Sequence, residues 1–205
     1  MKTTTIGLLI FDGAEELDFV GPWEVFTMAH QVLDHLKIDE NLEVITVSER
    51  GGSVLCAKGL EVIAGHSFAD CPPLDVLLVP GGAGTRREVE NKALLAWVAE
   101  TAKRCKWVTS VCTGSVVLAA AGPARGKRVT THWGSIQWLR ERGEAAQVLE
   151  NIRYVRDGSV VTSAGVSAGI DMSLWLIGQL YSPAAARMTQ HWVEYNPAPP
   201  YTAEV

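Results

Sequence analysis

Three kinds of segment are missing from this sequence, and each absence excludes a class of protein. There is no uninterrupted apolar stretch of about 18 residues, the length that a membrane-spanning helix needs. The short apolar run near the start leads directly into Phe11-Asp12-Gly13, without the small-residue cleavage site of a signal peptide. No basic run occurs, and a formal net charge of -5 gives no electrostatic attraction to nucleic acid. We therefore expect a cytoplasmic protein with neither a membrane nor a nucleic-acid partner.

The chain also lacks metal-binding cysteine patterns, repeats, linkers and low-complexity blocks. Its four cysteines show no Cys-x-x-Cys spacing, so we expect reduced thiols and no metal site. With 205 residues, 47% of them hydrophobic, the chain can bury the core of a single domain spanning 1–205. The cysteines are Cys56, Cys71, Cys105 and Cys112.

What the sequence does contain is an alternation of short apolar strands with longer helical segments. Such alternation predicts an α/β domain with a mostly parallel sheet and helices on both faces. Strands are expected at 3–10, 42–47, 53–57, 61–64, 74–79, 106–111, 128–131, 152–156 and 160–162. Helices are expected at 18–32, 92–104, 116–122, 134–142, 167–181 and 183–195, with a surface tail at 196–205.

The most informative segment covers residues 106–122. An apolar, β-branched run ends at Cys112, the small residues Thr113-Gly114-Ser115 follow, and a helix-forming stretch comes next. This order is typical of a nucleophile elbow, a sharp turn that lifts a reactive side chain off the end of a sheet. The N-terminus of the following helix favours a thiolate there. A buried structural cysteine at the end of a core strand fits the same residues.

Two further segments are expected beside this turn, because ligands of open parallel sheets bind beyond the carboxyl ends of the strands. Gly81-Gly82-Ala83-Gly84 follows an expected strand and can present backbone N–H groups to a developing negative charge, although an ordinary tight turn has the same composition. Asp18 follows the first strand. Its carboxyl group can act as the acid–base partner of a thiol, or it can cap a helix.

Five short motifs occur in a fixed order along the chain. They are Leu17-Asp18-Phe-Val-Gly21-Pro22-Trp-Glu24, Val79-Pro80-Gly81-Gly82, Thr109-Ser110-Val111-Cys112-Thr113-Gly114-Ser115, Thr130-Thr131-His132-Trp133 and Ala164-Gly165-Val166-Ser167-Ala168-Gly169-Ile170-Asp171. In these motifs the chain resembles the ThiJ/PfpI superfamily over residues 3 to 200. The resemblance implies a single-domain, flavodoxin-like α/β fold related to the class I glutamine amidotransferases, with a nucleophile elbow.

The same resemblance assigns roles to individual residues. It implies that Cys112 is the nucleophile, that Asp18 is its acidic partner, and that Thr113 lies beside the reacting atoms. It also implies a homodimer, with His132, Trp133 and the first helix as the expected contacts. The residues expected to line the substrate and oxyanion pocket are Gly81, Gly82, Ala83, Gly165, Val166 and Trp133.

Within the superfamily the chain most resembles the isocyanide hydratases, including in Phe68-Ala-Asp-Cys-Pro-Pro-Leu-Asp75 and Asn196-Pro-Ala-Pro-Pro-Tyr201. The implied reaction adds water to an isocyanide and gives an N-substituted formamide through a thioimidate on Cys112, with no cofactor. Two other functions stay open at this stage. One is a non-catalytic ligand-sensing domain like those of AraC-type regulators, and the other is glyoxalase or deglycase chemistry at the same cysteine.

Two absences disfavour a Cys–His hydrolase. PfpI-type proteases carry histidine directly after the nucleophile, where this chain has Thr113. The His-x-Glu pair of the glutamine amidotransferases is represented only by His191-Trp-Val-Glu194, which has a different spacing. A hydrolase would therefore need His132 to reach the pocket, and packing or an interface is the alternative role of that side chain. Asp171, near the start of a helix, is expected to bind local N–H groups.

Overall fold

In the computed structural model, which describes residues 2–197, seven strands form the central sheet. They are β1 (Lys2–Leu9), β2 (Glu40–Ser48), β5 (His66–Ser67), β6 (Val76–Val79), β7 (Trp107–Ser110), β10 (Tyr154–Asp157) and β11 (Val160–Ser163). Across the sheet they follow the order β10-β11-β7-β6-β1-β2-β5. Neighbours from β11 to β5 run parallel, and β10 pairs antiparallel with β11 at one edge. The expected mostly parallel sheet is confirmed.

Alternate residues of the inner strands enter two hydrophobic cores, one on each face of the sheet. In β6, Val76 and Leu78 lie in the first core, whereas Leu77 and Val79 lie in the second. Successive side chains of a strand point to opposite faces, so a strand covered on both faces needs an unbroken apolar run. This is why the continuous apolar run Val76–Val79, within the expected strand 74–79, predicts a central strand.

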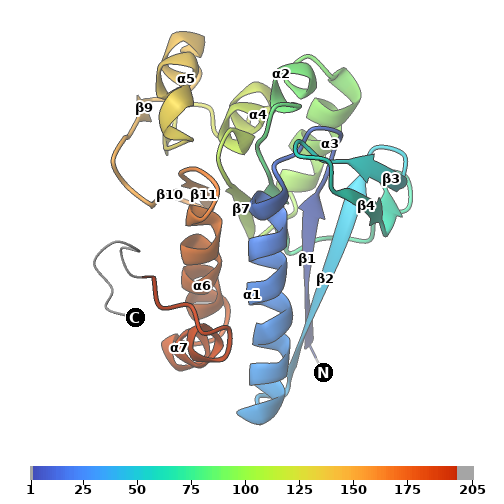
Figure 1. Ribbon diagram of the computed structural model, residues 1–205, viewed down its shortest axis with the longest axis vertical. Coiled ribbons are helices and arrows are strands. Elements are labelled where there is room, and N and C mark those ends of the chain that lie inside the picture. The colour runs from blue at the N-terminus through green and yellow to red at the C-terminus, as the bar shows by residue number, and fades with distance from the viewer. Residues whose placement is uncertain (1, 198–205) are drawn as a thin grey trace.

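Helices cover both faces of the sheet (Figure 1). The layer on the first core consists of α1 (Glu16–His35), α6 (Ala168–Leu180) and α7 (Pro183–Trp192), which pack on one another. The layer on the second core contains α3 (Lys92–Ala102) and α4 (Gly114–Ala121). The shorter helical elements are α2 (Thr85–Glu88), η1 (Trp133–Ser135) and α5 (Ile136–Arg142).

Two hairpins agree with the turn signals in the sequence. The strands β3 (Gly52–Leu55) and β4 (Glu61–Ala64) pair antiparallel outside the central sheet. The strands β10 and β11 are joined by Gly158 and Ser159, and Gly158 has the positive φ of +65° that such a turn requires.

The structure corrects the expected elements at three places. The first helix begins at Glu16 rather than residue 18, because Glu15 already adopts the extended N-cap conformation. The expected strand 128–131 ends as β8 (Arg128–Val129), which pairs with β9 (Gln147–Val148) outside the central sheet. The next two residues, Thr130 and Thr131, form hydrogen bonds that involve side chains instead of the backbone pairing of a strand. The elements β5, β9 and α2 are too short for periodicity to reveal, and residues 198–205 of the expected tail lie outside the described part.

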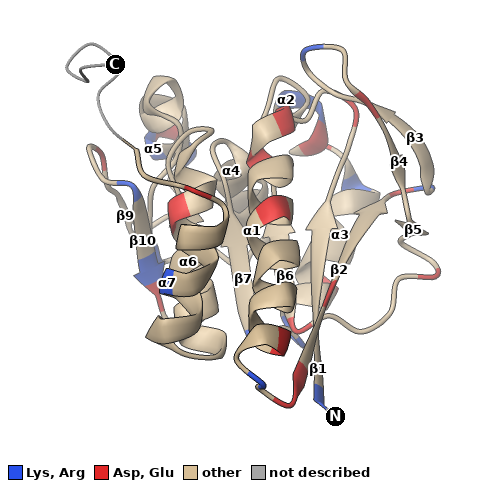
Figure 2. Ribbon diagram, turned by 60° about the horizontal axis from the view of Figure 1, so that its bottom comes forward, with Lys and Arg blue, Asp and Glu red and all other residues tan. Residues whose placement is uncertain are grey.

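Among the helices that the structure describes, none has the length and apolar character needed to cross a bilayer. Lys and Arg positions are scattered along the ribbon between Asp and Glu positions (Figure 2).

Candidate active site

Cys112 occupies a sharp turn between β7 and α4. Its φ is +56°, a left-handed conformation that is strained for a residue with a side chain and is typical of a nucleophile elbow. The Cys112 N–H donates to the Ala164 carbonyl at 3.1 Å, and the Thr131 hydroxyl donates to the Cys112 carbonyl at 2.9 Å. The segments after β8 and β11 therefore hold the strained turn in place.

Two glycines let the elbow lie directly against the loop after β6. A Cβ atom added at Gly114 would lie 2.1 Å from the Val79 carbonyl oxygen. One added at Gly81 would lie 2.4 Å from the Thr113 nitrogen and 2.9 Å from the Cys112 Cβ. Backbone atoms cannot move aside as a flexible side chain can, so both positions require glycine. The close approach brings the loop after β6 into the immediate surroundings of the Cys112 side chain.

Asp18 reaches the same place from the first turn of α1. Its side chain is fully buried, and Oδ2 accepts a hydrogen bond from the Gly81 N–H at 2.8 Å, whereas Oδ1 has no partner among the described residues. Burial raises the pKa of Asp18 to about 7, against the lowering effect of the Gly81 N–H. The carboxyl group does not cap its own helix, because the N-cap residue of α1 is Glu15.

The electrostatics of Cys112 differ from the sequence expectation. Burial, and then the negative charge of Asp18, raise the pKa of the thiol to about 12. Hydrogen bonds from the Thr113 N–H and hydroxyl and from the Val166 N–H act in the opposite direction. The N-terminus of α4 therefore does not make a resting thiolate, because desolvation outweighs it. The pair rests as a thiol beside a carboxyl group that titrates near neutral pH.

The N–H groups of the glycine-rich loop, for which the sequence predicts an oxyanion role, form hydrogen bonds within the site. The Gly81 N–H is engaged by Asp18, and the Gly82 N–H donates to the Thr113 Oγ1 at 3.0 Å. Both N–H groups therefore position side chains of the site in this structure. Ala83 is exposed to solvent.

Gly165 and Val166, which the sequence predicts to line the pocket, lie in the loop after β11. Val166 has a φ of +50°, and its N–H acts to lower the pKa of the Cys112 thiol. Gly165 packs under the His132 ring, where an added Cβ would lie 2.4 Å from His132 Cδ2. The His132 Nδ1 accepts a hydrogen bond from the Gly134 N–H at 3.1 Å, so the neutral ring carries its proton on Nε2. His132 thus contacts the backbone of the loop beside Cys112, which is a packing role.

Trp133 lies on the outer side of this region. Its side chain is 83% exposed and borders a cavity of about 270 Å³ together with Thr131 and Ala164. Those two residues bind the Cys112 backbone, so the cavity adjoins the elbow.

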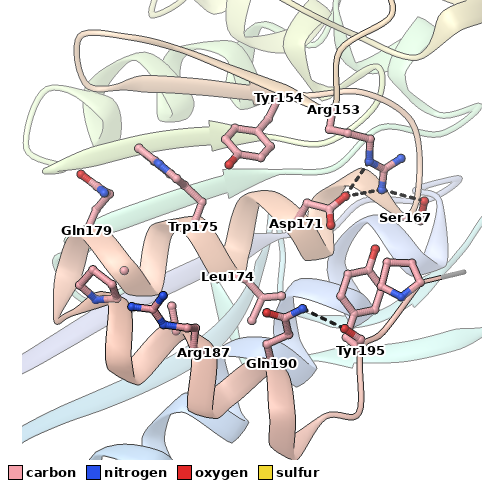
Figure 3. A pocket seen from close by; sticks show the side chains of 14 residues that line it. Arg153, Tyr154, Ser167, Asp171, Leu174, Trp175, Gln179, Arg187, Gln190 and Tyr195 are labelled. Atoms are coloured by element: carbon pink, nitrogen blue, oxygen red, sulfur yellow. Dashed lines mark hydrogen bonds and ion pairs between the residues drawn. The ribbon is translucent and has the colours of Figure 1, made fainter.

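A larger cavity of about 930 Å³ follows α6 and α7 (Figure 3). Among the described residues its lining comes from β10, α6, α7 and neighbouring loops, and includes neither Cys112 nor Asp18. At one end Arg153 Nε donates to the Asp171 carboxylate at 2.6 Å, and Arg153 also donates to the Ser167 hydroxyl at 3.1 Å (Figure 3). The expectation that Asp171 binds local N–H groups is therefore wrong, because it pairs with Arg153, the residue before β10.

The other thiols lie outside the elbow. Burial raises the pKa of Cys56, brings that of Cys71 to about 11 and that of Cys105 to about 12. Within residues 2–197 there is no group of three His, Cys, Asp or Glu side chains with the geometry of a metal site.

One buried side chain of the site carries no signal in the sequence. Thr85, the first residue of α2, is fully buried, and its hydroxyl oxygen lies 2.9 Å from the Thr113 Oγ1. Its position after the glycine-rich loop is the only hint, and that position fits any helix start.

We expect Asp18→Asn to stabilise the folded protein at pH 8 and to lose that advantage near pH 4. Because burial raises the pKa of Asp18 from 3.8 to about 7, the ionised unfolded chain is favoured increasingly between those pH values. Three pKa units correspond to a free energy of unfolding of up to about 4 kcal/mol. Urea denaturation at pH 4, 6 and 8 measures the gain. An equal gain at all three pH values would contradict the assignment.

With the geometry established, three comparisons place the chain among known proteins. It is 40% identical over 196 residues to an isonitrile hydratase of Pseudomonas putida, across 96% of this chain and 80% of that protein. It is 34% identical over 140 residues to the HTH-type transcriptional regulator CdhR of Pseudomonas aeruginosa, across 68% of this chain and 41% of the regulator. The crystal structure of a ThiJ/PfpI family protein from Pseudomonas syringae matches the whole chain and 80% of that protein, with a TM-score of 0.86 and 32% identity.

The family model described as the DJ-1/PfpI family matches residues 4–179. This match covers most of the chain and agrees with the elbow, the parallel sheet and the similar proteins above. The chain belongs to the DJ-1/PfpI family.

Proposed function

We propose that this chain is an isocyanide hydratase with Cys112 as its nucleophile. The observation that carries the proposal is a buried thiol at a strained elbow beside a buried carboxyl group whose pKa is about 7. Such a carboxyl group can both give and recover a proton at neutral pH. The substrate class is supported by the 40% identity to the Pseudomonas putida isonitrile hydratase.

The first half of the proposed reaction forms a thioimidate. The active form of the pair carries one proton, with Asp18 protonated and Cys112 as thiolate. The sulfur attacks the terminal carbon of R–N≡C, and that carbon takes the proton from Asp18, which gives R–N=CH–S–Cys112. The Thr113 hydroxyl and the N–H groups of Thr113 and Val166 stabilise the thiolate before attack.

The second half returns both groups to their starting state. Ionised Asp18 takes a proton from water, the hydroxide adds to the thioimidate carbon, and the nitrogen takes that proton from Asp18. The hydroxyl proton of R–NH–CH(OH)–S–Cys112 then passes to Asp18, the C–S bond breaks, and R–NH–CHO leaves. One water is consumed, and one carboxyl group acts as acid and base in turn.

A second candidate is a ligand-sensing domain without catalysis. It is favoured by the 34% identity to the regulator CdhR, of which this chain spans 41%. A sensor would bind a small molecule at the same elbow and release it unchanged.

The experiment that separates the two is incubation of the purified protein with a primary alkyl, a cyclic alkyl and an aryl isocyanide. The corresponding formamides are measured by mass spectrometry, with Cys112→Ala protein as the control. Formamide from the wild type alone supports the hydratase. Absence of formamide from all three, with the protein folded, would remove the proposal, and ligand-induced thermal stabilisation without turnover would favour the sensor.

We also propose that the protein is a homodimer that uses α1 and the region of His132 and Trp133. Leu17, Val20 and Trp23 recur at three-residue steps on one face of α1, and each is more than a third exposed. We expect a dimeric mass by light scattering at micromolar concentration, and a shift toward monomer in Trp23→Glu.

Ile63→Glu is the matched control for this prediction. Ile63 lies on β4 and is 76% exposed, so the same change there adds a charge away from the proposed contact and leaves the dimer intact. A monomeric wild-type protein, or a dimer that survives Trp23→Glu as well as it survives the control change, would contradict the proposed interface.

A further inference from the structure

Gly169 lies at the point where three elements around the site meet. It belongs to the first turn of α6, which packs beside α1 (Figure 1). A Cβ atom added at Gly169 would lie 2.8 Å from Val111 Cγ2, 3.1 Å from Val111 Cγ1 and 3.3 Å from Pro22 Cγ. Val111 directly follows β7, and Pro22 lies in α1. The missing side chain therefore lets α6, α1 and the end of β7 contact one another directly.

Both neighbours of Gly169 are close in sequence to the candidate reacting groups. Val111 is fully buried and immediately precedes Cys112. Pro22 is buried and lies one helical turn after Asp18, so the two residues share one face of α1. The packing at Gly169 therefore determines how closely the face of α1 that carries Asp18 approaches the elbow.

We propose that Gly169 is a positioning residue that sets the distance between the Asp18 carboxyl group and the Cys112 sulfur. A side chain at this position would push Val111 and Pro22 apart, and would move the elbow away from the first turns of α1. Proton transfer requires close contact between the two groups, so a small displacement lowers the rate without removing either group. The inference rests on Asp18 and Cys112 being the reacting pair of the proposed function.

Gly169→Ala tests the inference, because alanine adds the single Cβ atom. Gly169 lies inside a helix and its φ is not positive, so alanine fits its backbone. The atoms that the Cβ would meet belong to side chains, so we expect them to shift by a few tenths of an ångström in a folded protein. Crystal structures of the wild type and the variant should show a longer distance from the Asp18 carboxyl oxygens to the Cys112 Sγ. The kcat for formamide production should fall about 10-fold, with KM within about 2-fold of the wild type.

A second-site change separates this effect from a general loosening of the fold. Val111→Ala removes both methyl groups that the new Cβ atom would meet, so in the Gly169→Ala background it should restore the distance and most of the lost kcat. Two independent destabilising changes would add instead. The matched control is Gly178→Ala in the same helix, where the added Cβ would lie 3.6 Å from Ala186 Cβ, an ordinary contact. It should leave the distance and kcat unchanged.

Gly21→Ala presses on the same contact from the side of α1. A Cβ atom added at Gly21 would lie 2.9 Å from Ile170 Cγ1, and Ile170 is the neighbour of Gly169 in α6. This variant should also lengthen the distance between Asp18 and Cys112, and Ile170→Ala should reverse the change. The same two measurements are made on Gly21→Ala if Gly169→Ala does not fold.

Three results would overturn the inference. They are an unchanged distance between Asp18 and Cys112 in the folded glycine-to-alanine variants of this contact, an equal loss of kcat in Gly178→Ala, or no recovery when Val111→Ala is added. The crystallographic distance is read without an isocyanide substrate. The role of Gly169 can therefore fail while the wild type makes formamide, and the wild type can make none while the distance responds as expected.

Discussion

Cys112→Ala is expected to reduce formamide production to the background rate while the protein remains folded. Alanine removes the only atom that can form the thioimidate, and no other thiol is placed at an elbow in the described part of the chain. The same variant should remain folded, because it removes one buried sulfur atom and leaves the backbone hydrogen bonds of the elbow in place. Formamide yield and thermal unfolding are measured on the same preparations.

Two further variants make this result specific. Cys112→Ser keeps the size of the side chain but replaces the thiol with a hydroxyl that ionises far less readily, so it should be nearly as inactive as alanine. Cys105→Ala removes a thiol whose pKa is likewise raised to about 12 but which lies outside the elbow, and it should keep full activity. If Cys105→Ala were inactive and Cys112→Ala active, the nucleophile would have to be reassigned.

Asp18→Asn is expected to lower the rate of formamide production by about 10²–10⁴, the usual loss when general acid–base help is removed. Asparagine can still occupy the buried site and accept from the Gly81 N–H, but it cannot give and recover a proton. Asp18→Glu keeps the proton chemistry and displaces it by one methylene, so a partial defect is expected. Formamide is measured for both variants at matched folded fractions.

The pH profile gives this prediction a second readout. The pair holds two protons below the Asp18 pKa of about 7 and one proton above it. Because the one-proton form is the active one, kcat/KM of the wild type should rise through about pH 7, and this rise should be absent in Asp18→Asn. The matched control is Glu16→Gln, an acid in the same first turn whose carboxylate binds the Lys58 N–H instead of the site. Full activity in Asp18→Asn would move the acid–base role elsewhere, with His132 the next residue to test.

The local sequence was sufficient to predict the parallel sheet and the elbow at Cys112. Continuous apolar runs such as Val76–Val79 predict strands covered on both faces, because side chains of a strand alternate between two cores. The run of small residues after Cys112 predicts a tight strand-to-helix turn, and the structure agrees, because a Cβ atom added at Gly114 would lie 2.1 Å from the Val79 carbonyl oxygen. Both signals are local in the chain, so they can be recognised without the fold.

The allocation of hydrogen bonds and charge was decided by tertiary structure alone. The sequence does not show which acceptor the Gly81 N–H binds. In the folded chain it donates to Asp18, which lies 63 positions away in the sequence. The helix N-terminus at Cys112 predicts a thiolate, but burial raises the pKa of that thiol to about 12 and the pKa of Asp18 to about 7. Thr85 has no motif at all and becomes part of the site only because α2 packs against the elbow. Desolvation and partner choice depend on which distant segments meet, so they are determined only when the chain has folded.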